Sequence, residues 1–123
     1  MDQDQLEACR RSPRAREQRR RAALEDRRQA ALAAARQAAP ALLRLGARQV
    51  LLFGSILSPH RFHERSDLDL VVYGLPDRLW AKALGTLEDW PGLGEVEIDL
   101  KPAEDLPAEF LSFIEEQGEL VTP

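Results

Sequence analysis

The stretch from residue 51 to residue 73 restricts the fold of this chain more than any other. It reads LLFGSILSPHRFHERSDLDLVVY, so an apolar strand ends at Gly54-Ser55, eleven residues follow, and Asp67-Leu68-Asp69 opens a second apolar strand. Side chains alternate across a strand, and Asp67 and Asp69 therefore project from the same face. Two carboxylates in that position repel each other unless a cation lies between them. The pattern predicts two strands with a cation site at one end.

Gly54 and Ser55 indicate that the predicted site also binds phosphate. A glycine directly after a strand lets the backbone turn tightly and approach a ligand, and the Ser55 hydroxyl and nearby amide groups can donate to phosphate oxygens. A helix following the turn would favour an anion at its N-terminus. Proteins commonly hold Mg²⁺ through a few carboxylates together with substrate phosphates. The combination predicts a site for a magnesium-bound nucleoside triphosphate.

These residues resemble the signature of the DNA polymerase beta type nucleotidyltransferases. That family's pattern is an apolar strand, Gly-Ser, a spacer of about ten residues and Asp-x-Asp, which Gly54, Ser55, Asp67 and Asp69 match. The resemblance covers roughly residues 49–120, and the small size of the chain is similar to the minimal nucleotidyltransferase (MNT) branch. It implies two Mg²⁺ ions held by Asp67, Asp69 and a third carboxylate on a later strand, with ATP as the substrate.

Asp99 is the residue predicted to supply the third carboxylate. The later segment with strand-like alternation is Glu95-Val96-Glu97-Ile98-Asp99-Leu100, and the resemblance implies that Asp99 completes the second metal site or serves as a base. Glu97 points to the same face and is the alternative.

The phosphate loop departs from the family pattern. Family members follow Gly-Ser with a small residue, an arginine and a glycine, whereas this chain has Ile56-Leu57-Ser58-Pro59. Arg61 or Arg65 is predicted to supply the missing cation for nucleotide binding.

The elements expected along the chain define an α+β fold, with a small mixed sheet, flanking helices and a long N-terminal helix. Residues 1–11 are polar and are predicted to be a disordered tail. Residues 12–46 are predicted to be a helical arm that starts at Ser12-Pro13, and residues 47–123 the nucleotidyltransferase domain. The strands are expected at 49–53, 67–73 and 95–101 with a short edge strand at 120–121, and the later helices at 77–89 and 107–117.

Composition restricts the binding partners and the cellular compartment expected for this chain. A net charge of −4 argues against direct nucleic-acid binding, which usually requires a basic surface. Cys9 is the one cysteine, so no intrachain disulfide can form and a reducing compartment is expected. No apolar run reaches membrane-spanning length, and the first residues lack the apolar core of a signal peptide. We expect a soluble, cytoplasmic protein.

The resemblance also implies a function. The short chain has no second helical domain to complete an acceptor site, so another chain is expected to do so, and the Ala-rich N-terminal helix is a candidate surface for docking or oligomerisation. Minimal nucleotidyltransferases of this sort are similar to the antitoxin of MNT/HEPN toxin–antitoxin pairs, which transfers AMP from ATP to a tyrosine of the HEPN ribonuclease toxin. Two alternatives stay open: a catalytically weak module of the same fold that neutralises a partner by covering it, and an aminoglycoside-type nucleotidyltransferase.

Overall fold

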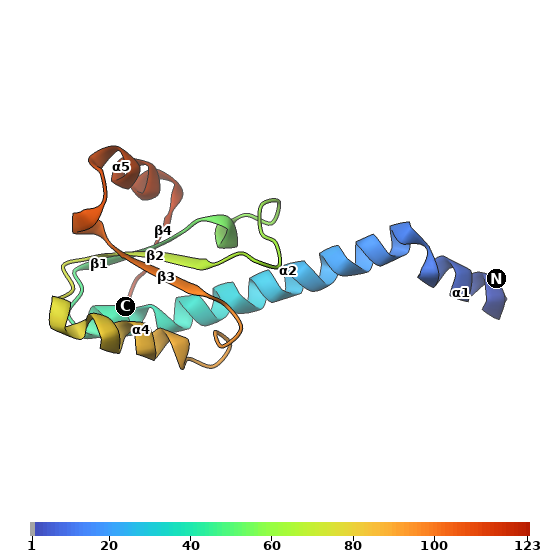
Figure 1. Ribbon diagram of the computed structural model, residues 1–123, viewed down its shortest axis with the longest axis horizontal. Coiled ribbons are helices and arrows are strands. Elements are labelled where there is room, and N and C mark those ends of the chain that lie inside the picture. Colours follow the sequence, from blue (N-terminus) through green and yellow to red (C-terminus); the bar gives the residue numbers. More distant parts are fainter. Residues whose placement is uncertain (1) are drawn as a thin grey trace.

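The computed structural model describes residues 2–123, except for the side chains of residues 8–11. A four-stranded mixed sheet in the order β3-β2-β1-β4 lies between helices (Figure 1). β1 pairs antiparallel with β2 and β4, and β2 pairs parallel with β3. The strands are β1 (Gln49–Phe53), β2 (Leu68–Tyr73), β3 (Ile98–Pro102) and β4 (Glu119–Leu120). The predicted α+β class is confirmed.

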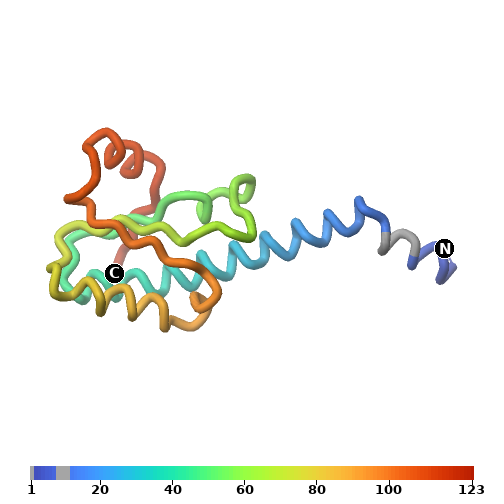
Figure 2. The backbone as a smooth tube through the Cα atoms, in the orientation of Figure 1, coloured from blue at the N-terminus to red at the C-terminus, as the bar shows by residue number. Residues whose placement is uncertain are grey.

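The long helix α2 (Pro13–Ala38) begins where the sequence predicts it. The Ser12 hydroxyl accepts a hydrogen bond from the backbone N–H of Ala15 at 3.1 Å, and Pro13 occupies the first turn. Pro40 then restarts the helix as α3 (Pro40–Arg44), because proline has no N–H to continue the first one. Figure 2 shows that the second half of α2 runs along the sheet, whereas the first half extends away from it.

The alanine stripe of α2 is used inside the chain. The buried residues of this helix include Ala31, Ala34, Ala35 and Ala38, and all four belong to the core that packs against the sheet. Small side chains allow this close approach of helix and strands. The more exposed part of α2 is therefore its first half, in which arginine is the most frequent residue.

A helix, α1 (Gln3–Arg11), is present where the sequence predicts a disordered tail. Its first turn is capped reciprocally: Asp2 Oδ1 accepts the backbone N–H of Gln5 at 2.8 Å, and Gln5 Oε1 accepts the backbone N–H of Asp2 at 3.1 Å. This arrangement is a capping box, which satisfies two donors that a helix start leaves free. Disorder was expected because this segment has few apolar residues. The reciprocal cap of Asp2 and Gln5 stabilises a helix there nevertheless.

The two faces of the sheet are covered unequally. Val50 and Leu52 face a large core formed with α2, α3 and α4 (Trp80–Glu88). Leu51 faces a smaller core with Ile114 of α5 (Ala108–Gln117), on the opposite face (Figure 1). The smaller core covers only part of its face. Polar residues that share this face with Leu51 can therefore reach solvent.

Several element boundaries differ from those expected. β3 begins at Ile98 rather than Glu95, because its partner β2 begins at Leu68 and residues 95–97 extend beyond that pairing. A 3₁₀ turn, η2 (Asp77–Leu79), precedes α4, where one continuous helix was expected. Another, η3 (Ala103–Asp105), follows β3. None of the helices in the described part of the chain is long and apolar enough to cross a bilayer.

Candidate functional site

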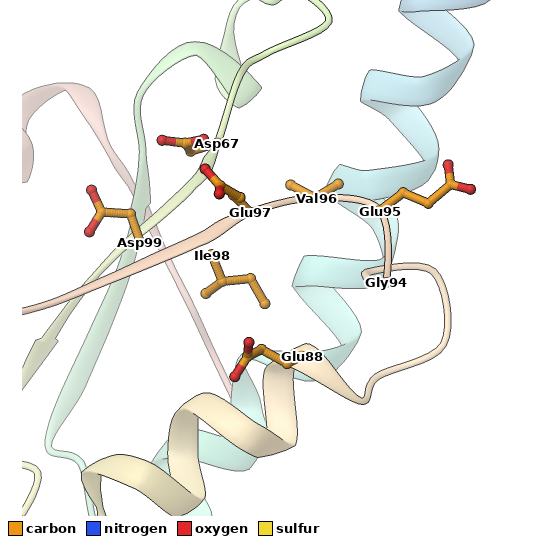
Figure 3. A pocket seen from close by; sticks show the side chains of 8 residues that line it. All are labelled: Asp67, Glu88, Gly94, Glu95, Val96, Glu97, Ile98 and Asp99. Carbon is orange, nitrogen blue, oxygen red and sulfur yellow. The ribbon is translucent and has the colours of Figure 1, made fainter.

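The predicted carboxylates lie at the open end of the sheet face that α5 partly covers. Asp69 of β2 is the register partner of Phe53 of β1 on one side and of Asp99 of β3 on the other. Neighbouring strands lie about 4.8 Å apart, so these three residues form a row across the sheet. Asp67 lies just before β2, and its side chain is on the same side of β3 as that of Asp99, whereas Ile98 points to the opposite side (Figure 3). The structure thus places Asp69 beside Asp99, and Asp67 lines the same edge of the sheet as Asp99.

Asp69 is the acid of this group whose pKa is shifted from its ordinary value. Partial burial of its carboxyl, followed by the negative charge of Asp99, raises its pKa from 3.8 to about 6. The charge of Asp67 and a hydrogen bond shared with Asp99 act in the same direction, whereas the charge of Lys101 lowers this pKa. The three carboxylates therefore interact electrostatically, as like charges around a cation site do.

Lys101 provides a positive charge that the sequence analysis did not identify. Its Nζ pairs with Oδ2 of Asp99 and lies 6.0 Å from the centroid of the Phe53 ring. Lys101 and Asp99 are two residues apart on β3, and alternation along the strand places both on one face. The same alternation, followed two residues beyond Asp99, would have pointed to Lys101.

Gly54 lies directly against Asp69. Its φ is +88°, a conformation that residues with a Cβ rarely adopt, and a Cβ built there would collide with Asp69 Oδ2 and lie 3.3 Å from Asp69 Cγ. The turn after β1 thus packs so closely against this carboxylate that no side chain fits at position 54. Only a 3₁₀ turn, η1 (Ser55–Leu57), follows it, so the longer helix that would add a favourable field for an anion is not formed there.

Arg28 of α2 holds this turn in place. The residue is buried; Nη1 donates to the carbonyl of Ile56 at 2.9 Å, and Nε and Nη2 donate to the carboxylate of Glu25 at 2.8 and 2.7 Å. No sequence motif points to Arg28. The spacing of Glu25 and Arg28 predicts a pair on the helix surface, and nothing in it indicates the contact with Ile56.

The two arginines predicted to bind phosphate occupy different places. Arg61 is exposed and lines a hollow together with Gly54. Arg65 is also exposed, and the contact described for it is made by its backbone N–H, which donates to His63 Nδ1 at 3.1 Å. Arg61 is therefore the better placed of the two beside the Gly-Ser turn.

Asp99 and Glu97 are also distinguished by their positions. Asp99 is the register partner of Asp69, whereas Glu97 precedes β3 and its side chain extends toward Asp67 (Figure 3). Asp67, Glu97 and Asp99 all line a hollow of about 570 Å³ at this edge of the sheet. Of the two acids, Asp99 is the one that lies in the row with Asp69.

The residues present have the chemistry that Mg²⁺ prefers, because it binds carboxylate oxygens together with phosphate oxygens. Asp67 and Asp69 would hold such an ion, with Asp99 joining them once Lys101 releases its carboxylate. Among the side chains that the structure describes, no three from His, Cys, Asp and Glu are already gathered as a metal site. The magnesium site stays a prediction.

Comparison with known proteins gives no further identification, since no protein-family model and no curated protein matches the chain. A functional assignment therefore depends on the fold and on the row of carboxylates beside Gly54.

Proposed function

We propose that this chain is a Mg²⁺-dependent nucleotidyltransferase that uses ATP. The observation that carries the proposal is the position of Asp69, which lies beside Asp99 in the sheet and against Gly54 at the turn. A triphosphate bound at Gly54 and Ser55 would have its phosphates next to these carboxylates. Bound Mg²⁺ would neutralise phosphate charge and lower the pKa of the attacking hydroxyl.

The proposed reaction is a displacement at the α-phosphorus of ATP. The acceptor hydroxyl oxygen forms a bond to this phosphorus, the bond from phosphorus to the bridging oxygen breaks, and pyrophosphate leaves with the electron pair. The hydroxyl proton passes to a carboxylate or to water, and Asp99 is the proposed base when it does not hold metal. Ser55 and Arg61 would steady the departing pyrophosphate, a contribution of position and charge rather than of covalent chemistry.

We further propose that the acceptor is a tyrosine of a HEPN-type toxin and that the chain acts as its antitoxin. The hollow lined by Asp67 and Asp99 supports a side-chain acceptor, because its volume of about 570 Å³ is in the range of small-molecule pockets of ~300–1,000 Å³ and it opens to solvent at the sheet edge. The resemblance to the MNT branch supports the choice of partner.

A second candidate function is a binding module with little catalysis. Two observations favour it. The first is that Lys101 forms an ion pair with the Asp99 carboxylate. The second is the loop after Ser55, which contains the fully buried Ile56, whereas the family pattern has small and positively charged residues in this loop. A chain with this loop could neutralise its partner by contact alone.

Label transfer separates these functions. The chain is incubated with Mg²⁺, ATP labelled at the α-phosphate and the product of the neighbouring gene. We expect label on that protein, abolished by Asp67→Ala and by Asp69→Ala and kept by Asp77→Ala, which changes an exposed acid away from the row. Tight partner binding without transfer, unaffected by the first two substitutions, would support the binding module. Transfer only to an added aminoglycoside would support a small-molecule enzyme.

A further inference from the structure

A second hollow opens on the other side of the row of carboxylates, between the turn after β1 and helix α5. Its volume is about 490 Å³, within the ~300–1,000 Å³ typical of pockets for small molecules. The residues around it include Phe53, Gly54, Arg61, Phe110 and Phe113. The hollow is therefore continuous with the turn at which the proposed function places the triphosphate.

The wall of this hollow is aromatic and open to solvent. Phe53 and Phe110 meet edge to face, with ring centroids 6.2 Å apart and an angle of 86° between the rings. Phe110 is 37% exposed and Phe113 is 56% exposed, which makes them two of the most exposed large apolar side chains described. Aromatic rings that are held in place yet accessible to solvent mark a surface for a ligand.

Charge and position indicate which ligand. The exposed guanidinium of Arg61 at the rim is complementary to phosphate. Phe53 is the register partner of Asp69, so a ring held at Phe53 lies one strand away from the proposed metal ligands. A flat ring joined to phosphates fits both features, and a nucleotide is such a molecule.

We propose that this hollow, defined by Phe53, Phe110, Phe113 and Arg61, binds the purine ring of the nucleoside triphosphate. The inference rests on the proposed function, because it places the phosphates at Gly54 and Ser55. The purine stacks against the exposed rings of α5, which every base can do through its π-face. Helix α5 then contributes to nucleotide affinity without touching the reacting phosphate.

The test uses the full chain and two probes that differ in the base. Isothermal titration calorimetry in Mg²⁺ measures the affinity for ATP and for inorganic tripolyphosphate, which has no base. Phe113→Ala is expected to weaken ATP binding about tenfold, the size of one lost stacking contact, and to leave tripolyphosphate binding unchanged. Phe113→Tyr keeps the ring and should bind ATP as the wild type does. Leu120→Ala is the control, since Leu120 is 54% exposed and lies on β4.

Each other outcome overturns the inference in a recognisable way. Equal ATP affinity in the wild type and Phe113→Ala would exclude the base subsite and leave the proposed function standing. Parallel loss of both probes in Phe113→Ala would show damage to the turn instead of loss of stacking. If Phe113→Ala binds ATP normally but no longer binds the protein partner, the hollow belongs to that contact. A wild type that binds neither ATP nor tripolyphosphate would overturn the proposed function as well.

Discussion

Asp69 and Asp99 lie opposite each other in the parallel pairing of β2 and β3. The pairing brings two acids together on one face, and the pKa of Asp69 rises to about 6 as a result of burial and of the charge of Asp99. Two adjacent acids lower the stability of the fold when both are charged. Like-charge pairs that destabilise the fold in this way are expected at functional sites. It also makes the contribution of Asp69 measurable.

Replacement of Asp69 by asparagine is expected to stabilise the chain at pH 7 and not at about pH 4. The folded-state pKa of about 6 lies above the ordinary value of 3.8, so the native protein binds the proton more tightly than the unfolded chain does. The wild type therefore loses stability as the pH rises from about 4 through about 6. Because Asp69 is only half-buried, solvent screening limits the gain at pH 7 to on the order of 1 kcal/mol.

Urea denaturation of the metal-free chain at the two pH values checks this expectation. Asp77→Asn is the matched control, because Asp77 is exposed and lies outside the row. An effect of Asp69→Asn that is equal at both pH values would contradict the assigned cause.

Lys101→Met is expected to strengthen divalent-metal binding on the order of threefold. The substitution frees the Asp99 carboxylate and removes a positive charge from beside the proposed ligands, and the effect is modest because both side chains are partly exposed. Titration with Mn²⁺, followed by the loss of the free-ion electron paramagnetic resonance signal, measures it. Lys82→Met removes the other lysine of the chain, on the exposed side of α4, and should leave the affinity unchanged. Weaker binding by Lys101→Met would show that Lys101 supports the metal site instead of competing with it.

Gly54→Ala is expected to lower the free energy of unfolding by at least about 1 kcal/mol. An alanine at φ +88° is strained, and its Cβ would collide with Asp69 Oδ2. Gly85→Ala gives the opposite result, a gain of roughly 0.5–1 kcal/mol, because Gly85 is in α4 and a Cβ there meets nothing within 4 Å. Thermal or urea unfolding of both variants compares them, and equal effects would refute the proposed contact.

Arg28→Ala is expected to destabilise the chain by about 2 kcal/mol. The change leaves the Ile56 carbonyl without its donor and removes both hydrogen bonds to Glu25. Arg27→Ala, at the preceding position of α2, changes an exposed arginine and should alter stability by less than about 0.5 kcal/mol. Urea unfolding provides the measurement. Similar values for the two variants would mean that Arg28 does not hold the turn.

The parts of the fold that the sequence predicted well depend on local chemistry. β1 spans Gln49–Phe53 as expected, α2 begins after Ser12 and ends before Pro40, and Gly54 adopts the positive φ that a tight turn requires. Strand alternation, a capping hydroxyl and the missing N–H of proline act over a few residues, so they can be read without the rest of the chain. The same holds for the capping box of Asp2 and Gln5, which the sequence contains but which was not predicted.

Only the tertiary structure decided which local features meet. Asp99 was predicted from the family resemblance and from strand alternation, but its position beside Asp69 depends on the register of two strands that are far apart in the sequence. The position of α5 over the same face and the contact of Arg28 with Ile56 are likewise contacts between segments distant in the sequence. Such contacts depend on how the whole core packs. The sequence by itself thus determined the kinds of residues at the candidate site, and the packing of the sheet between its helices determined their arrangement.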